Sequence, residues 1–495
     1  MHGSCRIHVL DDKISGVNHM KLDKSDFSEW YNTITKEAKL CDLRYGVKGF
    51  VVFMPWAVMT MNRMFSLYEK EMESHGHVPA LFPAVIPENY FTKESDHVAG
   101  FVPECFWVTE AGIHHLDEKL AMRPTSETAM YTMYSLWIKG KADLPFKLYQ
   151  RAQVWRYETK ATKPFIRSRE FYWLEAHNCF ATEEEAMNQV REDMEMAENI
   201  IHDEYCIPFF FFKRPQWDKF AGAVNTYAAD TLLPDGKALQ LPSTHMLGQN
   251  FSKAFDIKFM DDDEKEKYVW QTCYGPAISR IYAALIATHG DDSGLVLPFK
   301  LAPVQIVIVP IFKDDTKEKV IGKAKDVEKL LSDYTVKVDL TDKSPGFKFN
   351  EWEMKGVPIR IEIGMRDIEK GMVTLARRDT KEKTQLKPAD LKKEIEKAAE
   401  AIRRNLKQNA DKSFAEMTGM ADTVDDLNKA LDKGGFIRVP FCSDSNDAKG
   451  CAEVLKERCQ ANIRGSLFGA EMKPKGKCIA CGTDATIYLY AARQY

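Results

Sequence analysis

Two neighbouring segments of the chain carry arginines and aromatic residues at a spacing that could bind a nucleotide. Arg156 and Glu158 lie two positions apart near the end of an apolar segment, so a β-strand would point both side chains to one face. After a basic loop, a second segment repeats this period of two. An antiparallel pair of such strands would offer an arginine to an α-phosphate and a ring to adenine. The residues that would share one face of the second strand are Arg169, Phe171, Trp173, Glu175 and His177.

The two commonest nucleotide-binding motifs are absent from the sequence. There is no GxxxxGK(S/T) phosphate loop and no GxGxxG dinucleotide turn. A nucleotide would therefore be held by arginines and rings on strands, with Lys160, Lys163 and Arg167 of the basic loop near its outer phosphates. The spacing alone leaves a second interpretation open, in which the segments form a half-exposed hairpin with surface salt bridges.

The elements that must position these residues follow from hydrophobic periodicity. Apolar residues at helical spacing predict an amphipathic helix that ends near Gly76, and an extended segment is expected over 77–87. Strands are predicted over 147–158 and 169–177, and a surface helix over 182–198. This part of the chain is therefore expected to be α plus antiparallel β. The residues at helical spacing are Val58, Met61, Phe65, Tyr68 and Met72.

After Pro298 the pattern changes to short strands and helices in alternation. This alternation is typical of a small α/β domain with a partly parallel sheet. A polar stretch over 407–412 is expected to begin the link to a third unit. The expected strands are 304–310, 335–340, 357–363 and 372–376, and the expected helices are 320–334 and 388–406.

Length and composition limit the class of protein. A chain of 495 residues exceeds one hydrophobic core, so about three domains are expected. No apolar run approaches the roughly 18–20 residues that cross a bilayer, and residues 1–10 carry no secretory signal. These features predict a cytosolic protein without a membrane anchor. The net charge of −4 excludes a bulk polycation, so a nucleic-acid partner would need local basic surfaces.

The 11 cysteines are unlikely to form disulfides in a reducing compartment, and a cluster of them suggests a metal. Five of them crowd into the C-terminal part of the chain. Cys478 and Cys481 form a CxxC pair, which suits two thiolates on one tetrahedral ion. The other cysteines of this part are Cys442, Cys451 and Cys459.

Several strings of residues resemble the motifs of one enzyme family. RYETKATKPFIRSREFYWLEAH is similar to motif 2 of the class II aminoacyl-tRNA synthetases, and most closely to that of the prolyl branch. LFPAVIP resembles motif 1, the dimer interface of that class, and YGPAISRIYAALI resembles motif 3. RPTSET and QLPSTHMLGQNFSKAF resemble the two proline-binding segments of the prolyl enzymes. The HIGH and KMSKS elements of the other synthetase class are absent.

The resemblance extends over nearly the whole chain and implies an α+β protein of three domains. Residues 1–300 would form a class II catalytic domain built on an antiparallel sheet. Residues 301–408 would form an α/β anticodon-binding domain, and 409–495 a small zinc-binding α+β domain. The type implied is the archaeal and eukaryotic one, which lacks an inserted editing domain.

The implied activity is ATP-dependent attachment of L-proline to tRNA(Pro) through an enzyme-bound prolyl-adenylate, with release of pyrophosphate and AMP. The implied protein is a cytoplasmic homodimer that uses ATP with Mg²⁺ and carries one structural Zn²⁺ per chain. Arg156 and Arg280 would be its catalytic residues, and Gln240 would lie at the Mg²⁺. The implied ATP contacts are Arg156, Glu158, Arg167, Phe171, Gln240, Ser243, Ser279 and Arg280.

For proline, the resemblance implies that Thr125 and Glu127 accept hydrogen bonds from its protonated secondary amine. A carboxylate suits such a buried cation. Arg156 would also hold the carboxylate of proline, which brings the nucleophile to the nucleotide. The implied walls around the pyrrolidine ring are Phe101, Trp173, His177 and His245, for which ordinary core packing is the alternative.

The other two domains have their own implied sites. Phe349 could stack on an anticodon base, and Glu353 and Arg360 could read the edges of guanine. Phe349 could equally belong to the core of a plain α/β domain. The implied zinc ligands are Cys442, Cys451, Cys478 and Cys481, which would make a closed structural site and leave Cys459 as a bystander.

Two other functions are compatible with the class II motifs. A catalytically dead paralogue that binds tRNA or a partner would be expected to lose Arg156, Glu158 or Arg280, and all three are present. A synthetase for another amino acid, such as threonine, is disfavoured because the catalytic region lacks an evident Cys/His/His zinc set. The order Thr125-Ser126-Glu127 also points to an imino acid.

Overall fold

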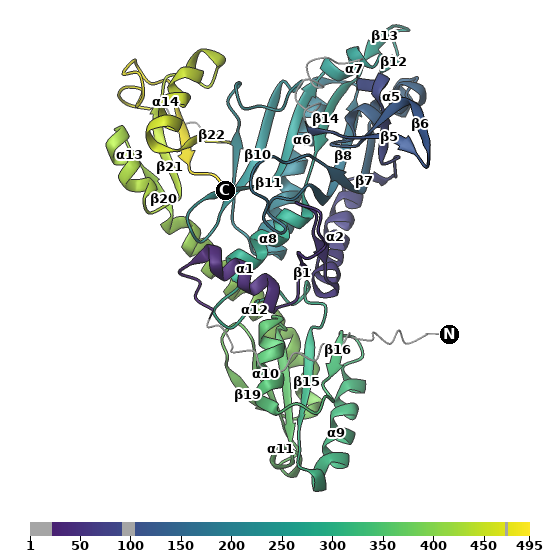
Figure 1. The fold of residues 1–495 in the computed structure, drawn as a ribbon, viewed down its shortest axis with the longest axis vertical. Helices are drawn as coiled ribbons and strands as arrows, with labels where there is room; N and C mark the ends of the chain where they lie inside the picture. Colours follow the sequence, from purple (N-terminus) through teal and green to yellow (C-terminus); the bar gives the residue numbers. More distant parts are fainter. Residues whose placement is uncertain (1–21, 92–103, 471–473) are drawn as a thin grey trace.

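The computed structural model describes residues 22–91, 104–470 and 474–495. Its centre is a sheet of eleven strands in the order β20-β21-β23-β22-β9-β10-β11-β14-β8-β7-β3 (Figure 1). Neighbouring strands are antiparallel except for the pairs β3–β7 and β20–β21. The strands from the first part of the chain are β3 (Val78–Pro79), β7 (Phe146–Trp155), β8 (Glu170–Phe180), β9 (Phe210–Lys213), β10 (Asn225–Leu232), β11 (Ala238–Gly248) and β14 (Trp270–Tyr274).

The hairpin of β7 and β8 confirms the two strands predicted from alternating residues. Its register pairs Trp155 with Glu170, and the backbone N–H of Arg156 donates to the carbonyl of Arg169 at 2.9 Å. β7 ends at Trp155, three residues before the predicted end, so Glu158 lies in the loop. The strand prediction therefore holds, but its C-terminal boundary was wrong.

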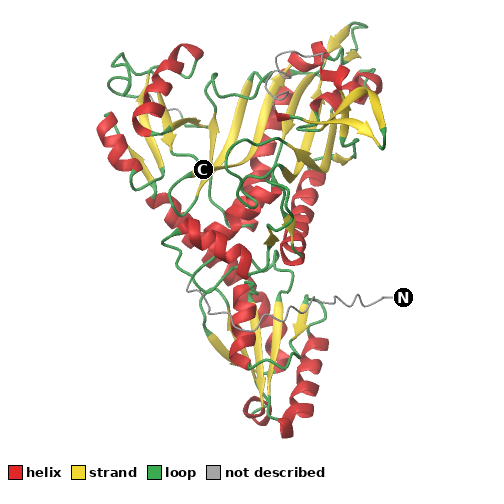
Figure 2. Ribbon diagram, viewed as in Figure 1, coloured by secondary structure: helices red, strands yellow, loops and turns green. Residues whose placement is uncertain are grey.

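Helices pack against the large sheet (Figure 2), and α2 packs on two of them, α6 and α8. The apolar α8 packs on β8, and α6 packs on β11 and β14. α2 confirms the predicted amphipathic helix, although Val58 is exposed rather than buried. Thr182 caps the predicted acidic helix in a capping box with Glu185. The helices of this part are α1 (Phe27–Glu37), α2 (Pro55–Ser74), α3 (Glu88–Phe91), α5 (Glu127–Trp137), α6 (Glu183–Ala197), α7 (Asn250–Ala254) and α8 (Ile278–His289).

Small sheets lie beside the large one. The segment expected to be extended over 77–87 contains β3 and β4, and β4 joins a three-stranded sheet in the order β4-β6-β5. This sheet leads directly into the loop before α5. The short strands are β1 (Cys41–Asp42), β2 (Val52–Phe53), β4 (Val85–Pro87), β5 (Phe106–Ala111), β6 (His114–Met122), β12 (Lys258–Met260) and β13 (Glu266–Tyr268).

The second part of the chain forms a separate five-stranded sheet in the order β16-β15-β17-β18-β19, at the bottom of Figure 1. β15 is parallel to β16 and β17, whereas β18 and β19 are antiparallel, which confirms the predicted partly parallel α/β unit. Its elements are β15 (Ile306–Ile311), α9 (Lys317–Leu330), β16 (Val336–Val338), α10 (Pro345–Met354), β17 (Ile359–Gly364), α11 (Met365–Glu369), β18 (Val373–Arg377), β19 (Lys383–Leu386) and α12 (Leu391–Glu416).

The third part of the chain, from β20 to the end, extends the large sheet. β22 pairs with β9, with Ser466 opposite Lys213 and Leu467 opposite Phe212. The polar stretch 407–412, expected to begin a link, lies inside the long α12. A continuous helix and a shared sheet therefore connect this part to the rest of the chain. Its elements are β20 (Thr418–Met420), α13 (Val424–Leu431), β21 (Phe436–Phe441), α14 (Lys449–Cys459), β22 (Asn462–Leu467) and β23 (Ile487–Ala492).

None of the helices in the described ranges combines the length and apolarity needed to span a bilayer.

Candidate functional site

A cavity of about 290 Å³ opens on the face of the large sheet. β8, β11 and β14 form its floor, the loop before α5 and the start of α8 form its sides, and β22 contributes from the third part of the chain. Ten of the residues for which the resemblance implies a role line it. They are Thr125, Glu127, Arg156, Phe171, Trp173, His177, Gln240, Ser243, His245 and Arg280.

Two arginines supply positive charge to the cavity. The Nε of Arg156 donates to the carbonyl of Pro124 at 3.0 Å, and its guanidinium lies 5.4 Å from the ring centre of Phe171. The Nε of Arg280 donates to the carbonyl of Ile166 at 3.2 Å. Burial, reinforced by the charges of Arg156 and Arg167, lowers the pKa of Arg280 to about 10. Both arginines are still positively charged at neutral pH, so this side of the cavity favours an anionic ligand.

A chain of buried carboxylates faces the arginines. Thr125 donates a hydrogen bond to Glu127, and Ser126 donates to Glu175 at 2.5 Å. The amide of Gln150 donates to both Ser126 and Glu175 at 2.7 Å. Glu127 and Glu175 are 3% and 2% exposed. Two carboxylates this deeply buried would stabilise a bound cation.

His177 sits at the base of the same pocket. Its Nδ1 lies 3.0 Å from the hydroxyl of Tyr131, and its Nε2 lies 3.3 Å from Glu175. Burial alone would lower the pKa of His177, but the hydrogen bond to Glu175 and the charges of Glu127 and Glu175 raise it above its ordinary value. The imidazole is therefore held on both ring nitrogens and acts as a wall of fixed orientation.

His245 is oriented by two hydroxyl groups. Its Nδ1 lies 2.9 Å from Thr226, and its Nε2 lies 3.0 Å from Ser243. The ring of Phe220 covers it, with 4.6 Å between ring centres. The indole N–H of Trp173 is buried in the cavity wall with no protein partner in the described part of the chain, so it could donate to a ligand.

The structure does not bring every predicted residue to the cavity. Among the described residues, Glu158, Arg167 and Ser279 do not line it. Arg167 instead lies 3.6 Å from Glu158 and donates to the backbone carbonyl of Tyr495 at 2.7 Å. Ser279 is buried, with its hydroxyl 3.4 Å from the carbonyl of Tyr172. Phe101 lies outside the described residues.

Sequence reasoning missed a buried ionic triad beside the cavity. Asp230 of β10 accepts hydrogen bonds from Arg214 at 2.8 and 2.9 Å and from Arg464 of β22 at 2.7 and 3.1 Å. Arg214 also donates to the carbonyl of Arg464 and contacts Gln240 at 3.3 Å. Burial opposes the charge of Asp230, yet the two arginines hold the pKa of this carboxyl below its ordinary value. The third part of the chain thus supports the cavity wall directly.

Nothing local in the sequence marks this triad, because Arg464 comes from a segment more than 200 residues away from the other two members. Glu175, by contrast, could be placed from the sequence. The alternation of side chains along a strand predicted that it shares one face with Phe171, Trp173 and His177. The structure confirms that shared face, and all four side chains line the cavity. Arg169, predicted on the same face, stacks on Tyr157 at 4.0 Å instead.

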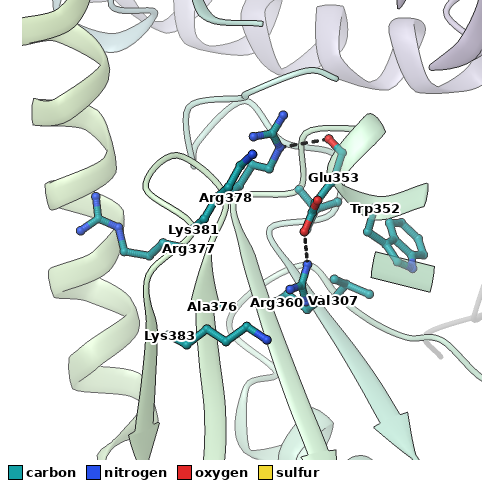
Figure 3. A pocket seen from close by; sticks show the side chains of 10 residues that line it. Val307, Trp352, Glu353, Arg360, Ala376, Arg377, Arg378, Lys381 and Lys383 are labelled. Atoms are coloured by element: carbon teal, nitrogen blue, oxygen red, sulfur yellow. Dashed lines mark hydrogen bonds and ion pairs between the residues drawn. The ribbon is translucent and has the colours of Figure 1, made fainter. Parts of the chain in front are cut away.

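A second pocket, of about 160 Å³, lies in the five-stranded unit (Figure 3). The guanidinium of Arg360 forms ion pairs with Glu353 at 2.7 Å and Glu362 at 3.0 Å and covers the ring of Phe349 at 4.0 Å. Phe349 is half-buried and does not itself line the pocket. Basic side chains dominate the lining, as a phosphate-bearing ligand requires. They are Arg360, Arg377, Arg378, Lys381 and Lys383.

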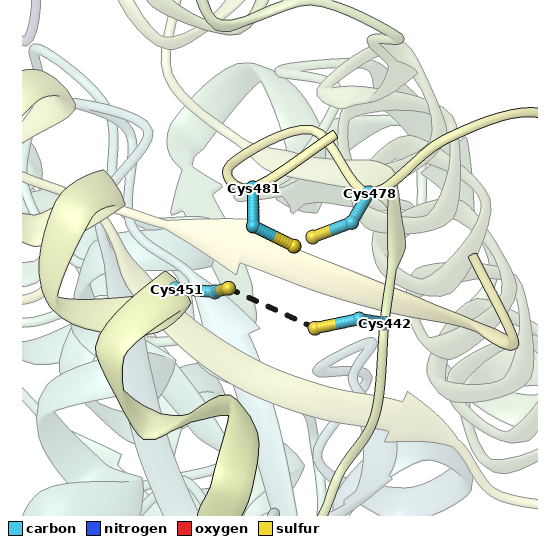
Figure 4. Close-up of side chains that lie close together, drawn as sticks. All are labelled: Cys442, Cys451, Cys478 and Cys481. Carbon is cyan, nitrogen blue, oxygen red and sulfur yellow. Dashed lines mark hydrogen bonds between the residues drawn. The ribbon is translucent and has the colours of Figure 1, made fainter. Parts of the chain in front are cut away.

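Four cysteine sulfurs converge in the third part of the chain (Figure 4). The Sγ atoms of Cys442, Cys451, Cys478 and Cys481 all lie within 4.8 Å of one another, and those of Cys442 and Cys451 are 3.7 Å apart. A tetrahedral zinc ion with Zn–S bonds of about 2.3 Å requires sulfurs about 3.8 Å apart. The donor set and the spacing both fit zinc. Cys459 is buried at the end of α14 outside this cluster.

Three known protein families match this chain, one in each of the three successive parts of the fold. Residues 106–289 match the family "tRNA synthetase class II core domain (G, H, P, S and T)", and residues 305–398 match "Anticodon binding domain". Residues 424–495 match "Prolyl-tRNA synthetase, C-terminal". The three matches follow one another along the chain without overlap.

Individual proteins are similar over nearly the whole length. The proline–tRNA ligase of Thermofilum pendens is 49% identical over 475 residues, which cover 95% of this chain and 98% of the relative. That of Pyrococcus horikoshii is 42% identical, with the same two coverages. A solved structure of Giardia lamblia prolyl-tRNA synthetase in complex with prolyl-adenylate has a TM-score of 0.92 and 36% identity, and covers 96% of this chain and 99% of that one. This chain therefore belongs to the prolyl-tRNA synthetase family of the class II aminoacyl-tRNA synthetases.

Proposed function

We infer that this chain joins proline to tRNA in two ATP-driven steps, and we propose roles for the residues of the cavity. The observation that supports this function is one pocket in which the acidic pair Glu127 and Glu175 faces the cationic pair Arg156 and Arg280. Proline carries an ammonium group and a carboxylate, and ATP carries the phosphates that the carboxylate attacks. A pocket lined by both acidic and basic side chains suits both substrates.

In the first step, Thr125 and Glu127 hold the secondary amine of proline, and Trp173, His177 and His245 enclose its ring. We also propose Phe101 as part of this wall, on the basis of the sequence alone. Arg156 binds the proline carboxylate and the α-phosphate together, which holds nucleophile and phosphorus in line. Phe171 and Arg280 enclose the adenine between a ring and a guanidinium.

The carboxylate then attacks the α-phosphorus, and pyrophosphate leaves. Arg156 and Arg280 stabilise the charge that develops on the phosphate oxygens. In the second step, the terminal adenosine hydroxyl of tRNA attacks the prolyl carbonyl and AMP leaves. No covalent bond to the protein is needed, so we assign no nucleophilic side chain. Glu158, Arg167, Ser243 and Ser279 remain proposed ATP contacts, and Glu158 and Arg167 lie on the loop beside the cavity.

ATP reaches the site with Mg²⁺, for which we propose Gln240 as a protein ligand. Its carbonyl oxygen lines the cavity and already accepts from Arg214 at 3.3 Å. Mg²⁺ prefers oxygen ligands and takes most of them from phosphates and water, so one neutral amide is a suitable protein contribution. When bound, the ion offsets the negative charge of the phosphates.

We propose that the basic pocket of the five-stranded unit binds the anticodon of tRNA(Pro). Glu353 offers acceptors and Arg360 offers donors toward base edges, and Phe349 lies beneath Arg360. Arg378 docks this unit on the catalytic part. It forms a bidentate ion pair with Asp291, with N–O distances of 2.6 and 2.8 Å. A tRNA bound here would therefore be held at a defined angle to the cavity.

We also propose that the enzyme is a homodimer and works in the cytoplasm. The short β3 forms one edge of the large sheet, and its Val78 and the nearby Leu81 are 56% and 79% exposed. An edge strand with exposed apolar side chains suits pairing with a second copy. A monomeric mass in sedimentation at micromolar protein would contradict the dimer.

ATP–pyrophosphate exchange with each standard amino acid tests the catalytic part of this function. We expect exchange to depend on proline, because Glu127 and the enclosed pocket fit a small cyclic imino acid. Exchange that depends on another amino acid, or on none, would reject the assignment. For the tRNA part, Arg360→Ala should lower the rate of tRNA charging and leave exchange unchanged. Lys319→Ala, on the exposed face of α9, serves as the control.

The cysteine cluster leads to a separate prediction about zinc. Protein purified without chelators should contain about one zinc ion per chain, held by the four thiolates. Cys478→Ser should lose the metal and lower the thermal stability of the third part more than it lowers the exchange rate. Cys459→Ser, a buried cysteine of the same unit outside the cluster, should retain the zinc. Elemental analysis that finds no metal in the unmodified protein would rule the site out.

A further inference from the structure

One buried thiol in the proline pocket has no part in the proposed reaction. Cys273 lies on β14 directly opposite His177 of β8, is 5% exposed and lines the cavity. Together with Glu127 these residues form a compact group, because their ligand atoms all lie within 4.8 Å of one another. The three come from three different elements, so the tertiary fold alone brings a thiol, an imidazole and a carboxylate together.

The donor set of this group indicates which ion it would bind. One sulfur, one nitrogen and one carboxylate oxygen suit zinc, whereas Mg²⁺ and Ca²⁺ prefer oxygen alone. Three protein ligands leave a fourth position of the tetrahedron open, in this case toward the cavity. The group therefore has the composition of an accessible zinc site, unlike the closed set of four cysteines in the third part of the chain.

The neighbours of the three ligands would support a bound ion. A histidine that binds zinc through one nitrogen needs a partner on the other. Either ring nitrogen of His177 could bind, because the remaining one would keep its contact with the hydroxyl of Tyr131 or the carboxylate of Glu175. Thr125 already donates to Glu127 and would hold its carboxylate in place. The carboxylate of Glu175 adds negative charge that offsets the cationic Arg156 nearby.

We propose that Glu127, His177 and Cys273 form an inhibitory zinc site inside the proline pocket. A zinc ion there would occupy the carboxylate that otherwise holds the amine of proline, so metal and amino acid would exclude each other. Binding forms a Zn–S bond and releases the thiol proton of Cys273 to solvent, with no change in oxidation state. The competition with proline rests on the proposed function, but the existence of the metal site does not.

A spectroscopic titration tests the site itself. Full-length protein with zinc already in the four-cysteine cluster is titrated with Co²⁺ in the absence of ATP and proline. We expect a thiolate-to-cobalt charge-transfer band that is lost in Cys273→Ser and retained in Cys206→Ser. Cys206 is a buried cysteine in another part of the core, whose thiol contacts the carbonyl of Arg403. A band that arose from exchange of cobalt into the four-cysteine cluster would persist in Cys273→Ser, so this variant separates the two sources.

A kinetic experiment then tests inhibition. Added Zn²⁺ should raise the apparent KM for proline in ATP–pyrophosphate exchange and leave the rate at saturating proline unchanged. Each variant is compared with its own rate without added zinc. The zinc inhibition constant should rise by at least about tenfold in Cys273→Ser, since even an outer-shell partner is worth about 10- to 100-fold in metal affinity. It should not change in Cys206→Ser.

The outcomes separate the two ideas. A cobalt spectrum identical in the unmodified protein and in Cys273→Ser overturns the metal site. A band that requires Cys273, with zinc inhibition that proline does not relieve, supports the metal site and contradicts the placement of proline at Glu127. A band that requires Cys273, together with competition by proline, supports both.

Discussion

Replacing Arg156 or Arg280 by alanine is expected to lower the rate of prolyl-adenylate formation more than about 100-fold while the protein stays folded. Both side chains line the cavity, and the proposed function assigns both to the ATP site. Loss of a charge-assisted contact that strengthens in the transition state costs about 3 kcal/mol or more, which corresponds to this factor. Proline-dependent ATP–pyrophosphate exchange measures the effect directly.

A matched control lies on β7, the strand that precedes Arg156. Arg151 of β7 is exposed, lies over the ring of Phe65 at 3.9 Å and does not line the cavity. Arg151→Ala should therefore leave exchange within a small factor of the unmodified rate. Circular dichroism and the thermal midpoint check that each variant is folded. Near-normal exchange in Arg156→Ala or Arg280→Ala would contradict the proposed ATP site.

Replacing Asp230 by alanine should destabilise the protein by about 3–5 kcal/mol, because two buried guanidinium groups would lose their shared carboxylate. Asp230 is fully buried, and Arg214 and Arg464 are 2% and 1% exposed. The variant should also weaken the contact between β22 and the catalytic sheet, since Arg464 belongs to the third part of the chain. We expect a lower urea midpoint, read by tryptophan fluorescence, and reduced exchange activity because Arg214 also contacts Gln240.

The control for this variant is Asp235→Ala. Asp235 is exposed and pairs with Lys237 at 2.9 Å, and such surface pairs contribute about 0–1 kcal/mol. The pH dependence should differ too. The folded-state pKa of Asp230 is lowered, so its contribution is complete above the ordinary carboxyl pKa of about 4 and is lost as the pH falls through the lower folded value. An unchanged urea midpoint in Asp230→Ala would show that the triad is not needed for stability.

The two strands of the catalytic hairpin show how far periodicity reaches. Alternation in β8 predicted that Phe171, Trp173, Glu175 and His177 share one face, and that face lines the cavity. Strand geometry is local, because successive side chains must point to opposite sides of the sheet. The end of β7 was not predictable in the same way. Beyond this end, the backbone N–H of Tyr157 donates to the carbonyl of Glu104 and the Nε of Arg156 donates to that of Pro124, and both acceptors belong to other segments of the chain.

The sequence by itself determined the class of the enzyme and the order of its three parts, since motifs and hydrophobic patterns are properties of neighbouring residues. It also determined the convergence of a CxxC pair with two further cysteines, as the resemblance implied. Only the tertiary structure decided which distant residues meet. Arg464 reaches Asp230 because β22 pairs with β9, and Cys273 meets His177 because β14 lies beside β8. Strand pairing between remote segments depends on packing of the whole sheet, and no short window of sequence contains that information.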